Sequence, residues 1–91
     1  MKNTATFRQL VYCLRPQIKW MKKRENREKI IIALEKEIAQ KLGISVQAVI
    51  FWRNSEKVPM ERVVQLSMIY KKDIYEFLEI ESNAAEGKTN D

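Results

Sequence analysis

With 91 residues, 45% of them apolar, the chain is long enough for one domain with a modest hydrophobic core. Only two Gly and two Pro interrupt it, which favours an all-α domain with short connections. No run approaches the roughly 20 apolar residues of a membrane helix, and the polar N-terminal stretch is unlike a secretion signal. A single cysteine, Cys13, cannot form an internal disulfide. These features predict a cytoplasmic protein with no membrane partner.

Charge is distributed unevenly along the chain. Residues 1–30 hold nine Lys or Arg and two Glu, whereas residues 63–91 hold three Lys and six acidic residues. A basic N-terminal third suits a polyanionic partner, because positive charge speeds encounter and supplies phosphate affinity. A solvated surface would show the same composition, so charge alone leaves both interpretations open.

The first predicted helix covers about residues 7–14. Thr6 and Gln9 have the spacing of a capping box, and apolar residues follow at helical spacing. Pro16 ends this helix and suits the first turn of the next one. The charged run 22–29 cannot be buried, so it is either an exposed helix or a solvated connection, with Asn26 available as a cap.

From Ile30 onward the pattern is clearly helical. Ile31, Leu34, Ile38 and Leu42 follow one another at three- and four-residue steps. No Gly, Pro, Ser or Thr interrupts residues 27–42. The sequence therefore leaves open whether this segment is one long helix or two helices joined by an unsignalled turn.

The C-terminal half contains two further predicted helices. Residues 53–59 read as a polar loop closed by Pro59, which suits the start of a helix. Asp73 and Glu76 have the spacing of a second capping box, which opens a last short helix. Residues 81–91 contain little apolar surface to bury and are predicted to be disordered.

The stretch from Glu37 to Asn54 predicts two helices joined by a tight turn. Gly43 permits the positive φ that a helix C-terminus needs, and Ala39 allows close approach of a second helix. Ser45 can cap that second helix. The expected shared core consists of Ile38, Leu42, Ile44, Val49 and Trp52.

This stretch resembles the Cro-type phage repressors and the related YdaS-like prophage regulators. The residues that carry the resemblance are Ile38-Ala39-x-x-Leu42-Gly43-Ile44-Ser45-x-x-Ala48-Val49-x-x-Trp52, followed by Val58-Pro59-x-Glu61-Arg62. The resemblance covers roughly residues 35–70. It implies a compact five- or six-helix, all-α domain with a central helix-turn-helix, of the lambda-repressor-like or Cro type.

The resemblance also implies an organisation and a function. Residues 1–80 would form one DNA-binding domain, made of a basic N-terminal extension (1–29), the helix-turn-helix (35–54) and C-terminal helices (59–80). The protein would be a transcriptional regulator, a repressor of phage or prophage type. Its partner would be double-stranded DNA with a palindromic operator, bound by a homodimer.

By position, the recognition helix would be residues 45–54, lying in the major groove. A glutamine amide can pair bidentately with adenine, so Gln47 is expected to read a base. Contacts to phosphate are expected from Ser45, Arg53 and Lys57. The complete set of expected DNA-binding residues is Ser45, Val46, Gln47, Ile50, Arg53, Asn54 and Lys57.

Three residues depart from the usual pattern. Glu35 places a carboxylate where related domains approach the phosphate backbone. Ile50 and Phe51 are apolar where polar or basic residues are usual. Contact with thymine methyl groups would explain them, as would burial against the N-terminal segment or a second subunit. We favour burial for Phe51, and the sequence does not decide for Ile50.

The residues predict no enzyme. Histidine is absent, and no glycine-rich phosphate loop or set of metal ligands is present, so no catalytic residue, metal or cofactor is expected. Cys13 and Trp52 are expected to pack in the core, and Trp20 in the core or an interface. The alternative function is a protein-interaction module, such as an antitoxin, that holds a partner protein with Ile50 and Phe51.

Overall fold

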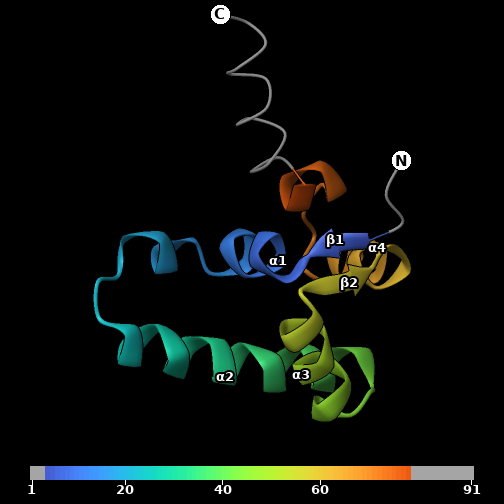
Figure 1. Cartoon of the computed structure of the whole chain (residues 1–91). Helices are drawn as coiled ribbons and strands as arrows, with labels where there is room; N and C mark the ends of the chain where they lie inside the picture. The colour runs from blue at the N-terminus through green and yellow to red at the C-terminus, as the bar shows by residue number, and fades with distance from the viewer. Residues whose placement is uncertain (1–3, 79–91) are drawn as a thin grey trace, which may run out of the picture.

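The computed structural model describes residues 4–78 (Figure 1). Within them the chain forms β1 (Thr4–Thr6), α1 (Phe7–Leu14), the 3₁₀ helix η1 (Pro16–Trp20), α2 (Arg24–Leu42), α3 (Val46–Ser55), β2 (Lys57–Pro59) and α4 (Met60–Ile69). Residues 74–78 are again helical. The prediction of a mostly helical chain is confirmed. A short antiparallel strand pair, β1 with β2, which the sequence did not predict, accompanies the helices.

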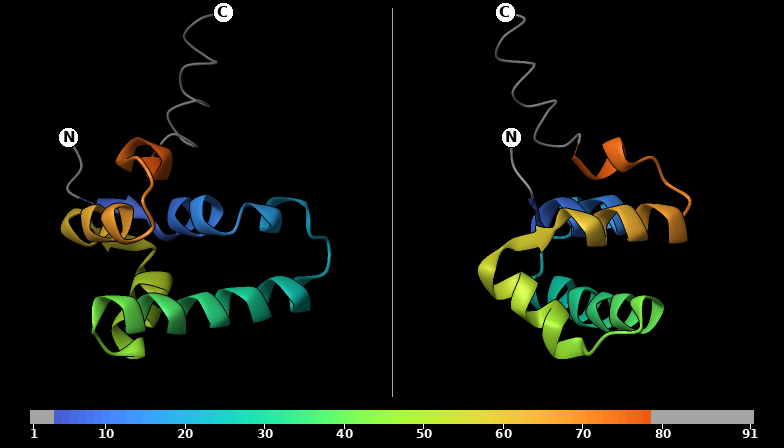
Figure 2. Two further views of the ribbon diagram at one scale, coloured as in Figure 1. Left: turned by 180° about the vertical axis from the view of Figure 1, so that it is seen from behind. Right: turned by 90° about the vertical axis from the view of Figure 1, so that its right-hand side faces the viewer.

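The helices lie in two layers, which all three views show (Figures 1 and 2). One layer holds α1, η1, α4 and the strand pair, and the other holds α2 and α3. Residues 74–78 lie on the side of α1 that faces away from α2. The short connection between η1 and α2 turns the chain from the first layer into the second, and β2 returns it.

The first helix has the predicted bounds and the predicted cap. The Thr6 N–H donates to Gln9 Oε1 at 2.8 Å, and the Gln9 N–H donates to Thr6 Oγ1 at 3.0 Å. Gln9 Nε2 also donates to the Leu78 carbonyl oxygen at 3.2 Å, which joins the helical residues 74–78 to α1. Pro16 begins η1, as its position after the first helix indicates.

One half of the second predicted capping box is present, and the other half differs, because Asp73 Oδ1 accepts from Tyr75 rather than from Glu76. The Asp73 N–H donates to Glu76 Oε2 at 2.9 Å, and Asp73 Oδ1 accepts from the Tyr75 N–H at 3.0 Å. The predicted disorder of 81–91 lies outside the described residues.

Residues 24–42 form one continuous helix, which answers the question that the sequence left open. The helix begins after Lys23, so Asn26 lies inside it and is not a cap. Its first half is largely exposed, because the charged side chains there find water rather than a neighbouring element. Farther along, Leu34, Ile38 and Ala39 turn inward and are buried.

The prediction of a polar loop over residues 53–59 is wrong, because residues 53–55 belong to α3 and Lys57–Pro59 form β2. β1 and β2 are antiparallel, and Ala5 faces Val58 in the register. Both of these side chains are buried, while Lys57 and Pro59 point outward. Pro59 is tolerated because its missing N–H lies at the end of a short edge strand. Three-residue strands carry almost no periodic signal of their own, and their pairing depends on contact between distant segments.

The core joins both layers. Its buried apolar residues are Ala5, Phe7, Leu10, Val11, Leu14, Ile18, Leu34, Ile38, Ala39, Val49, Trp52, Val58, Val63, Leu66 and Phe77. A polar link adds to it at the edge: Glu37 on α2 accepts hydrogen bonds from Arg15 at 2.9 Å and from the Tyr70 hydroxyl at 2.5 Å. This link ties α2 to the end of α1 and to the end of α4.

Candidate functional site

The connection between α2 and α3 is set by its hydrogen bonds. Gly43 has a φ of 69°, in the left-handed region that glycine adopts at little cost. The Ile44 N–H donates to the Ala39 carbonyl at 3.0 Å, and the Gly43 N–H donates to the Gln40 carbonyl at 3.3 Å. These two bonds satisfy carbonyl groups that a helix end would otherwise leave unpaired. The predicted tight turn at Gly43 is confirmed.

The start and the inner face of α3 follow the prediction as well. Ser45 caps the helix, because its hydroxyl oxygen accepts from the Ala48 N–H at 3.3 Å. Val49 and Trp52, three residues apart, turn toward the core and are buried. Since both anchors lie on one face, α3 has a defined rotation about its axis. Within the described residues, the opposite face is exposed.

The exposed face of α3 carries three of the seven expected DNA-binding residues, Gln47, Ile50 and Asn54. Gln47, Phe51 and Asn54 are exposed and recur at four- and three-residue steps, so they form one stripe. Ile50 lies beside this stripe and is half-buried. No acidic residue occurs anywhere in α3. We call Gln47, Ile50, Phe51 and Asn54 the outer face of α3.

The remaining expected residues lie near the two ends of α3. Ser45 is exposed at the first end, next to Val46, which is half-buried and packs against the core. Lys57 is exposed on β2, just beyond the second end. These three residues flank the outer face.

Phe51 is 68% exposed. The described part of the N-terminal segment therefore does not cover it, and that form of the predicted burial is wrong. The physical reason is the rotation of α3: Val49 and Trp52 take the inward positions, which leaves Phe51 pointing to solvent. Burial in a second subunit stays a prediction.

Arg53 forms ion pairs with two carboxylates of α2 instead of pointing freely into solvent. Its Nε lies 2.9 Å from Glu35 Oε2, without the alignment of a hydrogen bond, and its Nη1 lies 3.6 Å from Glu28 Oε1. Glu35 is 2% exposed, so it does not present its charge to a ligand, contrary to our expectation for this residue. The sequence gives no sign of this pairing, because the two residues lie on different helices.

In the ion pair between Arg53 and Glu35, the attraction to Arg53 does not offset the desolvation of the Glu35 carboxylate. Desolvation raises the pKa of the Glu35 carboxyl above its ordinary value, although Arg53 acts in the opposite direction, and Glu28 raises it further. Burial of Glu35 therefore costs more than Arg53 returns. Removal of Arg53 would leave this cost uncompensated.

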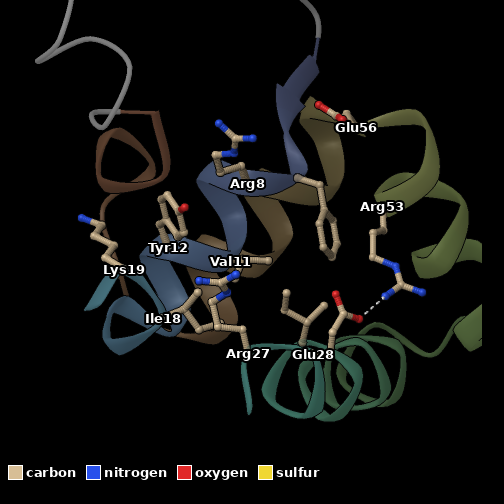
Figure 3. Close-up of a pocket in the computed structure, with 11 residues that line it drawn as sticks. Arg8, Val11, Tyr12, Ile18, Lys19, Arg27, Glu28, Arg53 and Glu56 are labelled. Atoms are coloured by element: carbon tan, nitrogen blue, oxygen red, sulfur yellow. Dashed lines mark ion pairs between the residues drawn. The ribbon is translucent and has the colours of Figure 1, made fainter. Parts of the chain in front are cut away.

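A cleft opens between α1 with η1 on one side and α2 with the end of α3 on the other (Figure 3). Its volume is about 580 Å³. Apolar side chains form part of its wall, and charged side chains stand around it; the lining residues include Val11, Ile18, Ile31, Arg27 and Glu28. Sequence reasoning missed this cleft, since its walls come from segments whose contact depends on the fold.

Two other residues singled out in the sequence have clear positions. Cys13 is half-buried and packs against the core, and burial raises the pKa of its thiol, which disfavours the reactive thiolate. Trp20 is 74% exposed, so core packing of this residue is excluded and an interface stays a prediction.

Residues 4–78 contain no group of three or more His, Cys, Asp or Glu placed to hold a metal ion. None of the helices in residues 4–78 has the length and apolar character needed to cross a membrane.

Comparisons with family models, curated proteins and solved structures find no match to this chain.

Proposed function

We propose that the protein is a sequence-specific DNA-binding regulator of transcription, a repressor of phage or prophage type. In this proposal α2 and α3 act as a Cro-type helix-turn-helix, and a homodimer binds a palindromic operator. One observation carries the proposal: α3 is anchored to the core by one face, and its opposite face is exposed and free of acidic residues.

The dimensions of α3 suit a major groove. Its 10 residues span about 15 Å at 1.5 Å per residue, and the groove is about 12 Å wide. Gln47 lies in the first turn of the helix, where base contacts concentrate in helix-turn-helix proteins. Its amide would pair with adenine, and Asn54 would make a second polar contact. Ile50 and Phe51 would lie against thymine methyl groups.

Phosphate contacts would come from the ends of α3. Ser45 and Val46 lie at its N-terminus, where free N–H groups and the helix dipole favour an anion, and Lys57 supplies a cation at the other end. Arg53 is engaged by Glu35 and Glu28. We therefore propose that Arg53 connects α2 with α3 and does not bind phosphate.

The test begins with selection of bound sites from random duplex DNA by the full chain. The selected duplex is then titrated by fluorescence anisotropy at several salt concentrations. We expect a palindromic site, nanomolar affinity and a steep loss of affinity as salt rises.

Gln47→Ala is the informative variant, with Gln17→Ala as its matched control. Gln17 is exposed on η1 and lies outside the outer face of α3. Loss of a bidentate base contact is worth about 1–3 kcal/mol, so Gln47→Ala is expected to weaken binding at least fivefold and to relax the preference at one base pair. Equal affinity of the two variants, with both folded, would exclude α3 as the reading helix.

The exposed Phe51 favours a second candidate, a protein-interaction module such as an antitoxin. A large apolar side chain in water is usual at the centre of protein interfaces. This function predicts a stoichiometric protein partner that buries Phe51, and loss of that partner in Phe51→Ser. Salt-sensitive binding of a selected DNA site by the isolated chain, with no such partner, would favour the repressor instead.

A further inference from the structure

The cleft between the two layers has a partly apolar wall that no other described segment covers. Val11 and Ile18 contribute to it from α1 and η1 (Figure 3), and Phe7 and Ile31 also line the cleft. Its volume of about 580 Å³ falls within the range of about 300–1,000 Å³ that is usual for small-molecule sites. Its size therefore suits a small molecule.

Three cations of the cleft form no ion pair within the described part of the chain. Arg8, Lys19 and Arg27 line it, and none of them has a carboxylate within ion-pair distance among residues 4–78. Arg53 also lines it but is engaged by Glu35 and Glu28. Among residues 4–78, the cleft thus presents three positive groups that no carboxylate pairs with.

Two of these cations are already oriented. Arg27 Nη1 donates to the Met21 carbonyl oxygen at 2.9 Å, which fixes one edge of its guanidinium. In Figure 3 Arg27 rises from α2 toward α1, beside Ile18. The Lys19 ammonium lies 5.7 Å from the centroid of the Tyr12 ring. Such groups lose less conformational freedom when they bind a ligand.

Charge is divided between the two ends of the cleft. Lys19 and Arg27 lie toward η1, whereas Glu28 and Glu56 lie toward α3 (Figure 3). Arg53 also lines the end toward α3, but it is already engaged by Glu28 and Glu35. That end therefore offers less attraction to a second anionic group than the end at Lys19 and Arg27. A ligand with a single anionic group at one end suits this arrangement, because its anionic group can lie at the cations and its apolar body along the apolar wall.

We propose that this cleft binds a small amphipathic anion, with its carboxylate or phosphate at Arg27 and Lys19 and its apolar body along Val11, Ile18 and Ile31. The proposal does not depend on DNA binding, and the probe is tested on the protein alone.

Decanoate is the probe, titrated into the full chain by isothermal titration calorimetry. Two matched compounds test the two parts of decanoate separately. Decanol has the ten-carbon alkyl group without the negative charge, and acetate has the carboxylate without the long alkyl group. We expect saturable one-to-one binding of decanoate below about 1 mM. Decanol and acetate should each bind at least about tenfold more weakly, since about 1.4 kcal/mol corresponds to a tenfold change.

Variants locate the site. Arg27→Gln and Lys19→Gln remove cations of the cleft, and each is expected to weaken decanoate binding about tenfold. Arg62→Gln is the matched control, since Arg62 lies on α4, outside the cleft, and contacts Gln65. Far-UV circular dichroism checks that every variant is folded.

Three results would overturn the proposal. They are absence of saturable binding, equal affinity for decanol, and equal weakening in Arg62→Gln and the two cleft variants. The last result would mean that decanoate binds any basic surface of the protein.

Discussion

Replacement of Arg53 by methionine is expected to destabilise the fold by about 3 kcal/mol, although Arg53 is a partly exposed surface residue. Methionine retains an apolar stem of similar length, so the change isolates the charge. It leaves Glu35, which is 2% exposed, as a buried carboxylate beside the negative Glu28.

The magnitude follows from the geometry. Two unit charges 2.9 Å apart interact by about 6 kcal/mol at an effective dielectric constant of 20. Water screens part of this attraction, because a third of the Arg53 side chain is exposed. Loss of one partner from a buried ion pair costs about 3–5 kcal/mol in other proteins, and the lower end applies to this half-screened pair.

Neutralisation of the carboxylate should cost far less. In Glu35→Gln the buried group no longer carries a charge, so we expect a change within about 1 kcal/mol. Burial raises the pKa of Glu35, which means that its charged form already weakens the fold at neutral pH. The double variant Arg53→Met with Glu35→Gln should therefore recover most of the stability that Arg53→Met loses.

The assay is urea unfolding followed by far-UV circular dichroism, at pH 7 and at pH 5. A carboxyl whose pKa is raised by folding binds its proton more tightly in the folded state, so stability rises as pH falls through that pKa. The deficit of Arg53→Met should thus shrink at pH 5. Equal losses of unfolding free energy in Arg53→Met and Glu35→Gln would refute the reasoning. So would a loss in Arg53→Met that is the same at pH 7 and pH 5.

Two further variants test the hydrogen-bonded carboxylate of Glu37 and the turn at Gly43. The hydrogen bond from Tyr70, with a contribution from Arg15, lowers the pKa of Glu37, so its stabilisation is present above its ordinary pKa and is lost as pH falls. Glu37→Gln should cost about 1 kcal/mol at pH 7 and less at pH 3 in urea unfolding; equal cost at both pH values would contradict this. Gly43→Ala should cost about 1 kcal/mol through its left-handed backbone alone, since an added Cβ meets no atom within 4 Å. Thermal unfolding measures the loss, and Gly43→Asn should lose less.

The sequence by itself determined the elements that depend on neighbouring residues. The caps at Thr6 and Ser45, the turn at Gly43 and the bounds of α1 are local: each needs only a side chain and the backbone a few residues away. The core positions of Val49 and Trp52 could also be predicted, but Ile50 and Phe51 beside them are equally apolar, so the sequence did not show that Phe51 is exposed.

Only the tertiary structure decided the features that join distant segments. The pairing of β1 with β2, the ion pair between Arg53 and Glu35, and the cleft each need two segments brought together by the fold. Arg53 shows the consequence most clearly. In the sequence it is one more cation on a candidate DNA-binding helix, and in the structure a buried carboxylate of α2 holds it.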